Sequence, residues 1–348
     1  MQTRRSKSAM MSGAKALSGR GRRGILLVTC LISAAYPSES PGRAVENPDL
    51  SNALEGLRQA DIRVASVLYH LQKSNGQLCA KRGPLTGLVM HSSNEYGESI
   101  RSEAVRHFDF ESTVGIEGVV PNSPASVASI EPDDSVVAVD GAKLLGDATP
   151  RSVIGMIVRD SALGPIVFQL RRSGVVRSVA VRPVAGCVAR VELDVSDGLN
   201  AATDGDTIQI DSALVNLVGG DDQALAAILA HELAHIVLDH PARLTAAHVN
   251  RGMFKGFGRS ARLFKQTENE ADRLSVTLMV NAGYDPNAAV RYWRTYGPQL
   301  NDHGGFGSTH LAWQKRADLI AAEVARVAKE KQRPIIPDWL SSRDQPLR

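Results

Sequence analysis

The sequence predicts an α+β protein in which a mainly helical domain with a small sheet is interrupted by an inserted, strand-rich block. Three observations lead to this prediction. Apolar residues follow a helical spacing over residues 50–75, short alternating strands separated by turns occupy residues 113–184, and helical patterns return after residue 222. The chain has 348 residues, of which 43% are hydrophobic and 22% charged, so it is long enough for two globular domains.

The first 35 residues are predicted to be an export signal. A basic stretch is followed by the apolar run ILLVTCLISAA at residues 25–35, which ends in small residues suited to cleavage. This run is too short to span a bilayer as a helix and no longer one follows, so no transmembrane segment is expected. The predicted location is the periplasm, with lipid anchoring through Cys30 or secretion as alternatives. A disordered basic tail with a short buried helix is the other interpretation of this segment.

The positive charge of the chain is concentrated at its N-terminus. Seven lysines and arginines precede the first acidic residue, Glu39, so the net charge of +3 for the whole chain becomes −4 for the remainder. A slightly acidic body gives no reason to expect a nucleic-acid partner.

The remaining boundaries follow changes in composition. Residues 36–48 contain three prolines and are predicted to be a flexible lead-in. Residues 49–111 join the first helix to a mixed segment that packs on the helical domain. The strand-rich block follows at 112–186, the helical domain at 187–333 and a tail at 334–348. In the helical domain we expect strands at 190–196 and 206–218 and helices at about 222–240, 261–282, 287–295 and 311–332.

Two cysteines flank the strand-rich block. After removal of the signal only Cys79 and Cys187 remain, and an even pair in an exported chain favours a disulfide. Such a bridge would close a long loop at the base of the inserted block. Two unpaired buried cysteines are the alternative.

The stretch ILAHELAHIVLDH, residues 228–240, has the spacing of a catalytic zinc site. On a helix each residue advances about 100°, so His231 and His235 face the same side and Glu232 lies at its rim. Two imidazoles one turn apart can bind one ion, and the flanking carboxylate can reach a water on it. His240 is expected on the opposite side of the helix from His231. The alternative is an ordinary buried helix that contains these residues by chance.

A catalytic zinc needs a third protein ligand, which we expect in KQTENEADRLSV, residues 265–276. Glu268 and Asp272 are four apart and share a helix face, so Glu268 can bind zinc while Asp272 orients a zinc-bound histidine. Glu270 points about 200° away from Glu268, and its neighbour four residues on is Leu274, so it is the poorer ligand and has no supporting partner there. The alternative is a solvated helix start with acids near its positive end.

HELAH together with ENEADRLSVTLMVNAGYDP resembles the HtpX and BepA-like gluzincin metallopeptidases, the family that includes the CAAX prenyl proteases, over about residues 205–320. The resemblance implies a zincin-type metallopeptidase domain with one Zn2+ per subunit. It also implies that the zinc ligands are His231, His235 and Glu268 and that Glu232 is the general base. Asp272 would contact a ligand and not the metal itself.

A later segment, STHLAWQKR, is similar to a further motif of this family. The resemblance implies that His310 lies near the zinc, where it steadies the oxyanion or occupies the open position, and that Arg316 supports the site. Leu311 stands where the family has proline. A surface-loop histidine is the alternative for His310.

The stretch VVPNSPASVASIEPDDSVVAVDG resembles a bacterial PDZ domain, with Asp133-Asp134 in place of the usual Gly-Asp. The resemblance implies that an extended peptide is bound as an added strand, with its C-terminal carboxylate held by a loop just before Thr113. A PDZ-shaped spacer without peptide affinity is the alternative.

In the helical domain, the strand DTIQI at 206–210 is where related zincins bind substrate as an added strand.

Together these patterns predict an exported zinc endopeptidase that hydrolyses unfolded or misassembled cell-envelope proteins. A zinc-activated water would attack the peptide bond, with Glu232 taking its proton and delivering it to the leaving amine. Two other functions stay open. One is a latent or chaperone-like periplasmic binding module that uses its PDZ domain, and the other is a PDZ adaptor with an accidental metal motif.

Overall fold

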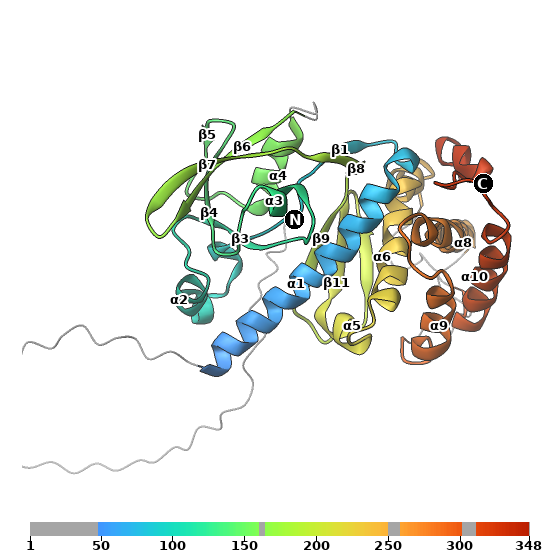
Figure 1. The fold of residues 1–348 in the computed structure, drawn as a ribbon. Coiled ribbons are helices and arrows are strands. Elements are labelled where there is room, and N and C mark those ends of the chain that lie inside the picture. Colours follow the sequence, from blue (N-terminus) through green and yellow to red (C-terminus); the bar gives the residue numbers. More distant parts are fainter. Residues whose placement is uncertain (1–47, 160–163, 250–257, 301–310, 348) are drawn as a thin grey trace, which may run out of the picture.

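The computed structural model describes residues 48–159, 164–249, 258–300 and 311–347. It is built from both helices and sheets, arranged around two main hydrophobic cores (Figure 1). The predicted export signal and most of the predicted lead-in lie outside the described residues. Within the described residues, no helix is both long enough and apolar enough to cross a membrane.

Helix α1 (Pro48–Ser74) runs along both halves of the molecule (Figure 1). Its C-terminal part packs in the larger core through Val64, Leu68 and Leu71, as the helical spacing predicted. Near its N-terminus, Leu54 packs with Tyr96 and Phe108, beside α2 (Glu98–His107). The stripe of apolar residues in this one helix therefore serves two different cores.

The strand-rich part is a six-stranded sheet with the order β2-β3-β4-β6-β7, in which the short β5 pairs with β4. It extends N-terminally of residue 112, because β2 pairs antiparallel with β3. The intervening helices α3 and α4 complete its core of Ile116, Phe168 and other apolar residues. The elements are β2 (Leu88–Ser92), β3 (Val114–Val119), α3 (Pro124–Val127), β4 (Ser135–Val139), β5 (Ala142–Lys143), α4 (Pro150–Arg159), β6 (Ile166–Arg172) and β7 (Val175–Val181).

The sheet order corrects the expected position of the peptide-binding loop. The segment just before Thr113 leads into β3, which has strands on both sides and cannot accept another. Phe108 and Phe110 in that segment pack against α1 in the small core that contains Leu54. The strand at the edge of the sheet beside α4 is β2. The order of the strands depends on long-range pairing, which the local motif did not reveal.

The chain enters and leaves the strand-rich part at one place. Strand β1 (Arg82–Leu85) pairs antiparallel with β8 (Val184–Cys187), so the two crossing segments lie side by side. A disulfide joins Cys79 to Cys187, with 5.5 Å between their Cα atoms. These links hold the base of the strand-rich part against the rest of the chain.

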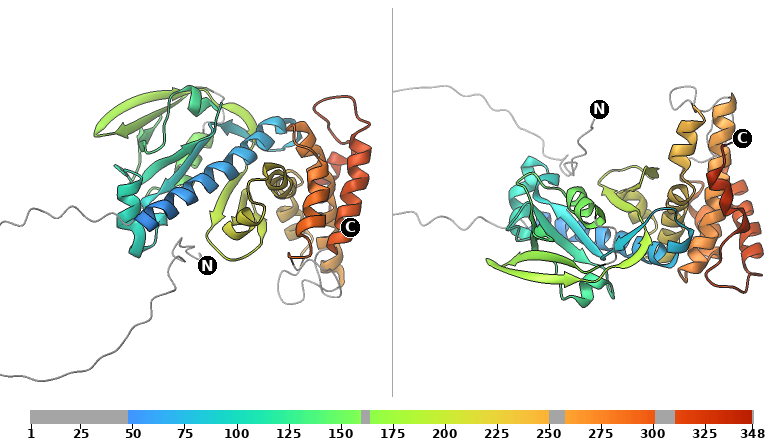
Figure 2. Two further views of the ribbon diagram at one scale, coloured as in Figure 1. Left: turned by 60° about the horizontal axis from the view of Figure 1, so that its bottom comes forward. Right: turned by 90° about the horizontal axis from the view of Figure 1, so that it is seen from above.

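The helical part contains a three-stranded sheet with the order β10-β11-β9. This sheet lies between the larger sheet and the C-terminal helices (Figure 2). Its elements are β9 (Arg190–Asp194), β10 (Ala201–Asp204), β11 (Thr207–Asp211), α5 (Ser212–Leu217), α6 (Asp222–Val237), α7 (His240–Ala246), α8 (Gly258–Asn281), α9 (Asn287–Tyr296), α10 (Trp313–Val327) and a 3-10 turn at Asp338–Asp344. Two further 3-10 turns lie at Gly76–Leu78, after α1, and at Ser93–Glu95, after β2.

Two sequence predictions in this part are wrong. The strand expected at 206–218 ends at Asp211, and α5 follows because Leu214, Val215 and Val218 bury a helical rather than an alternating stripe. The single helix expected at 222–240 breaks at Asp239, whose backbone is left-handed with φ 51°. His240 therefore begins a separate helix, α7.

Candidate metal centre

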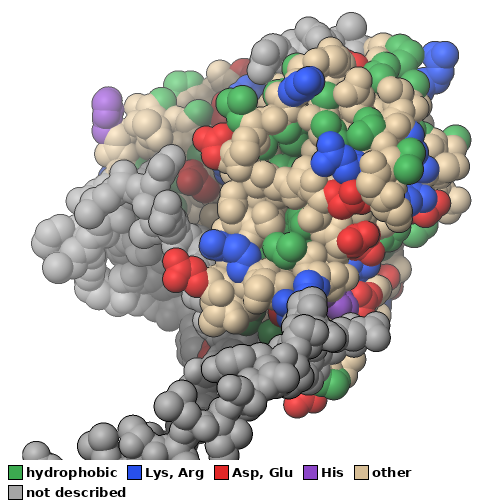
Figure 3. Space-filling model, turned by 90° about the vertical axis from the view of Figure 1, so that its left-hand side faces the viewer, with side chains coloured by type: hydrophobic (Ala, Val, Ile, Leu, Met, Phe, Trp, Pro, Cys, Tyr) green, Lys and Arg blue, Asp and Glu red, His purple; other side chains and the backbone are tan. Residues whose placement is uncertain are grey.

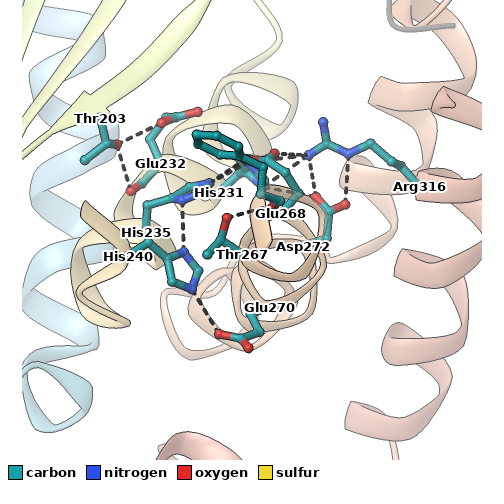
Figure 4. A network of polar contacts seen from close by, with 11 residues as sticks. Thr203, His231, Glu232, His235, His240, Thr267, Glu268, Glu270, Asp272 and Arg316 are labelled. Carbon is teal, nitrogen blue, oxygen red and sulfur yellow. Dashed lines mark hydrogen bonds and ion pairs between the residues drawn. The ribbon is translucent and has the colours of Figure 1, made fainter. Parts of the chain in front are cut away.

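Two adjacent helices bring the predicted metal ligands together. Helix α6 is capped by Asp221, whose side chain accepts hydrogen bonds from backbone N–H groups of the first turn, and the helix packs closely on α8. His231 and His235 project from α6 towards Glu268 on α8 (Figure 4). The three side chains each offer one ligand atom, and these atoms lie within 4.8 Å of one another.

The distances between these atoms fit a tetrahedral zinc ion. The two histidine Nε2 atoms are 3.2 Å apart, and the Glu268 carboxylate oxygens lie 3.3 Å from His231 Nε2 and 3.6 Å from His235 Nε2. Ligands that sit about 2.0–2.2 Å from a tetrahedral ion are about 3.4 Å from one another. Two imidazoles and a carboxylate are also the donor set that a catalytic zinc uses, with the fourth position left open.

A buried ion pair orients the imidazole ring of His231. Its Nδ1 lies 3.0 Å from the Asp272 carboxylate, which also accepts two hydrogen bonds from Arg316 at 2.7 and 2.9 Å. The guanidinium of Arg316 stacks 3.9 Å from the ring centroid of Trp293. Burial raises the pKa of Asp272, but Arg316 and His231 outweigh this effect and hold it below its usual value. Asp272 therefore stays charged and orients the ring so that Nε2 faces Glu268.

His235 is held by a second set of residues that the sequence analysis did not identify. Its Nδ1 lies 2.9 Å from Nδ1 of His240, and His240 Nε2 lies 3.1 Å from the Glu270 carboxylate. Arg243 donates to the same carboxylate at 2.7 Å. Glu270 is not part of the metal group, as expected. The expectation that it has no supporting partner is wrong, because both His240 and Arg243 contact it. The break at Asp239 explains the difference, because it turns His240 back towards the site.

The two ligand histidines have different electrostatic environments. Burial lowers the pKa of His235 well below its usual value. Burial also lowers the pKa of His231, but hydrogen bonds with Asp272 and Glu268 outweigh this and raise it to about 10. Metal binding needs both imidazoles neutral, so a metal entering this site would displace a proton from His231.

The carboxylate of Glu232 lies beside the metal group (Figure 4). Its side chain is only 7% exposed, and the hydroxyl of Thr203 on β10 donates a hydrogen bond to its carboxylate at 2.8 Å. Burial raises the pKa of this carboxyl group, which increases its affinity for a proton. A carboxylate whose affinity for a proton is raised is better suited to accept one from water. No feature of the sequence singled out Thr203.

The site opens into a cavity of about 560 Å³. One wall is β10, an edge strand, and the others are formed by α6, α8 and α9. The expected substrate strand DTIQI is wrong, because β11 lies between β10 and β9 and has no free edge. The Asp-Gly turn at Asp204-Gly205 returns the chain alongside β11, and this dipeptide was the signal for a hairpin. His310 lies outside the described residues.

Comparisons with known proteins agree with a metallopeptidase. Residues 183–264 match the model of Peptidase family M48, a range that includes the HELAH motif and ends before Glu268. Two curated relatives, each called mitochondrial metalloendopeptidase OMA1, are similar to part of the chain. The Schizosaccharomyces pombe protein is 30% identical over 133 residues, covering 32% of this chain and 39% of the relative. The Saccharomyces cerevisiae protein is 28% identical over 139 residues, covering 33% and 40%.

The chain thus spans about two fifths of the length of these relatives. Among solved structures, the HtrA3 PDZ domain bound to a phage-derived ligand (FGRWV) matches 30% of this chain and 89% of its own, at 20% identity with a TM-score of 0.24. The comparisons support Peptidase family M48. The narrower resemblance to HtpX and BepA-like enzymes stays a prediction.

Proposed function

We propose that this protein is a zinc-dependent endopeptidase that cleaves extended segments of polypeptides. The observation that carries the proposal is the convergence of His231, His235 and Glu268 at tetrahedral spacing beside the buried carboxylate of Glu232. The match to Peptidase family M48 and the name metalloendopeptidase of the two relatives support the same reaction.

Each residue of the site has a distinct role in the proposed peptide hydrolysis. His231, His235 and Glu268 would hold the zinc ion, which when bound supplies a Lewis acid that polarises a carbonyl and acidifies water. Glu232 takes a proton from the attacking water and passes it to the leaving nitrogen. Thr203 orients the carboxylate of Glu232 through its hydrogen bond.

The shape of the site favours an extended substrate. Among the described residues, β10 has β11 on one side only, so its other edge can pair with a polypeptide backbone beside Glu232. A folded segment presents no free strand to such an edge, so we propose unfolded or misassembled proteins of the cell envelope as substrates. The Cys79–Cys187 disulfide supports an oxidising compartment, which agrees with the proposed export.

Zinc content and proteolysis, measured on the same preparations, test this function. We expect one zinc per chain in the unsubstituted protein and in Glu232→Gln, and a loss of zinc in Glu268→Ala, which removes a ligand. Glu232→Gln should lower kcat/KM for unfolded casein by about 10²–10⁴-fold, because the proton acceptor is gone. Glu330→Gln is the matched control, since Glu330 is exposed and lies outside the site.

Each outcome separates the proposal from its alternatives. Cleavage that survives in Glu232→Gln would reject the mechanism. A latent or chaperone-like module predicts zinc and casein binding without cleavage in the unsubstituted protein. An accidental metal motif predicts no zinc in protein purified without chelators.

A further inference from the structure

The short helix α7 forms part of the wall of the metal cavity. It starts after the left-handed residue Asp239 and contacts α6 and α8. Its residues His240, Pro241 and Leu244 line the cavity. The position of α7 therefore sets both the shape of this wall and the place from which His240 reaches His235.

A segment distant in the sequence, Gln345–Leu347, packs against α7. The side chain of Leu347 is only 4% exposed and lies in a small apolar cluster with Leu244 of α7 and Leu263 of α8. The chain just before this segment is anchored separately, because Leu340 packs in the larger core. The segment is therefore a third support for α7, in addition to α6 and α8.

Arg243 of α7 connects this segment to the metal site. Its Nε donates a hydrogen bond to the backbone carbonyl of Gln345 at 3.2 Å, and its Nη1 donates to the Glu270 carboxylate at 2.7 Å. Glu270 in turn contacts His240, and His240 contacts Nδ1 of His235 (Figure 4). A continuous series of polar contacts thus runs from the distant segment to a proposed metal ligand.

Burial and the shape of the guanidinium make the contacts of Arg243 specific. Charged side chains on a protein surface, such as the interspersed basic and acidic groups on the face seen in Figure 3, are solvated and form weak ion pairs. Arg243 is by contrast only 8% exposed. Its planar fork of donors holds the Glu270 carboxylate and the Gln345 carbonyl at the same time, and a lysine has the charge but not the fork.

We propose that Arg243 is a positioning residue for the metal site, and that residues 345–347 hold Arg243 and α7 in the position that this role needs. The proposal rests on the proposed function for the identity of the metal, whereas the connection from the segment to His235 rests on the contacts alone. Without these contacts α7 can shift, His240 supports His235 less well, and zinc is bound more weakly. The segment thus affects zinc binding although it supplies none of the proposed ligands.

Zinc affinity, measured by competition with a chromophoric chelator, tests the proposal. Leu347→Ala removes the apolar contact with Leu244 and leaves every residue of the metal site in place. We expect it to weaken zinc binding by about threefold to tenfold, since the change acts on His235 through several intervening contacts. Leu347→Met, which keeps the apolar bulk, should retain the affinity.

Leu340→Ala is the matched control for Leu347→Ala. Both leucines are buried and both belong to the same stretch of the chain, but Leu340 packs in the larger core and not with Leu244. The two changes therefore remove the same side-chain atoms from different places. We expect zinc affinity in Leu340→Ala to equal that of the unsubstituted protein, even where its stability to urea is lower.

A double-mutant cycle shows whether the apolar and polar contacts of the segment act through the same route. Arg243→Lys keeps the charge but cannot hold both partners, so we expect zinc binding about threefold to tenfold weaker. Arg243→Lys/Leu347→Ala should bind zinc no more weakly than the weaker of the two single variants.

Amide hydrogen exchange of the zinc-free proteins gives a measurement that needs no metal. Leu347→Ala should speed exchange in α7 and leave exchange in α9 as it is in the unsubstituted protein, because only α7 loses a support. Leu340→Ala should leave exchange in α7 unchanged.

Three results would overturn the proposal. They are unchanged zinc affinity in Leu347→Ala, equal weakening by Leu347→Ala and Leu340→Ala, and additive effects of Leu347→Ala and Arg243→Lys. Failure of the proposed function gives a different result, because casein would then stay uncut by the unsubstituted protein whatever the zinc affinities of the variants.

Discussion

Each of the two histidines proposed as metal ligands is oriented through its Nδ1 by a different neighbour. Asp272 serves His231 directly, while His240 serves His235 and is itself held by Glu270. With Nδ1 occupied in this way, both rings present Nε2 to the position that Glu268 also faces. Such contacts fix the orientation of the imidazole ring, and a ring whose orientation is not fixed binds a metal ion more weakly.

We expect His240→Ala to weaken zinc binding by about 10–100-fold, since it leaves His235 without its hydrogen-bond partner. Competition with a chromophoric chelator measures the affinity directly, without relying on activity. His248→Ala is the matched control, because His248 is exposed and outside this network. An affinity in His240→Ala equal to that of the control would show that His235 needs no such support.

Among the elements, the strand-rich sheet is tied together by one buried carboxylate. Asp134, at the start of β4, accepts hydrogen bonds from Arg172 of β6 at 2.6 and 2.8 Å and from Arg177 of β7 at 2.7 Å. Burial raises the pKa of Asp134, but these arginines outweigh it and hold the pKa below its usual value of 3.8. The charged form is therefore more stable in the folded sheet than in the unfolded chain.

This lowered pKa sets the sign of a pH effect on stability. The stabilisation from Asp134 is fully present above pH 3.8 and is lost as the pH falls through the folded-state pKa. We expect Asp134→Asn to lower the free energy of unfolding by about 2 kcal/mol at pH 7, with the difference shrinking below pH 3.8. Urea titrations from pH 7 to pH 3 measure this, and the exposed Asp318→Asn should show no such trend. A constant difference across this range would contradict the assignment.

The elements also show which parts of the fold and of the candidate site could be predicted from the sequence. Local spacing identified the helices that carry His231 and Glu268, because an apolar stripe and a motif coincide within one segment. It missed β2, since a short strand without a turn signal is recognisable only by the partner it pairs with. It also missed β10, although the Asp204-Gly205 turn is a signal for the hairpin with β11. It missed the role of His240, because that depends on one left-handed residue, Asp239, which redirects the chain.

At the scale of the whole molecule, α1 packs on both sheets and on α6, the helix that carries His231 and His235. In the first half of α1, Arg58 pairs with Asp133, whose backbone is left-handed (φ 69°). Further along, Arg63 binds Asp222 and the carbonyl of Gly219 at the beginning of α6. The strand-rich part is thus held at two places, by α1 and by the β1–β8 base with its disulfide.

The disulfide should provide much of the stability of that base. Cys79 and Cys187 are 108 residues apart, so their bond restricts a long loop of the unfolded chain. We expect the Cys79→Ala/Cys187→Ala protein to lose about 2–5 kcal/mol of unfolding free energy in urea titrations. Adding reductant to the unsubstituted protein is the control and should give a similar loss.

Zinc content distinguishes a local loss from a global one in the same proteins. The proposed metal ligands lie on α6 and α8, which pack directly on each other and not through the β1–β8 base. We therefore expect the folded double-alanine protein to keep one zinc per chain in dilute buffer. A protein that loses zinc before it unfolds would show instead that the inserted part and the metal site depend on each other, with α1 as the connection between them.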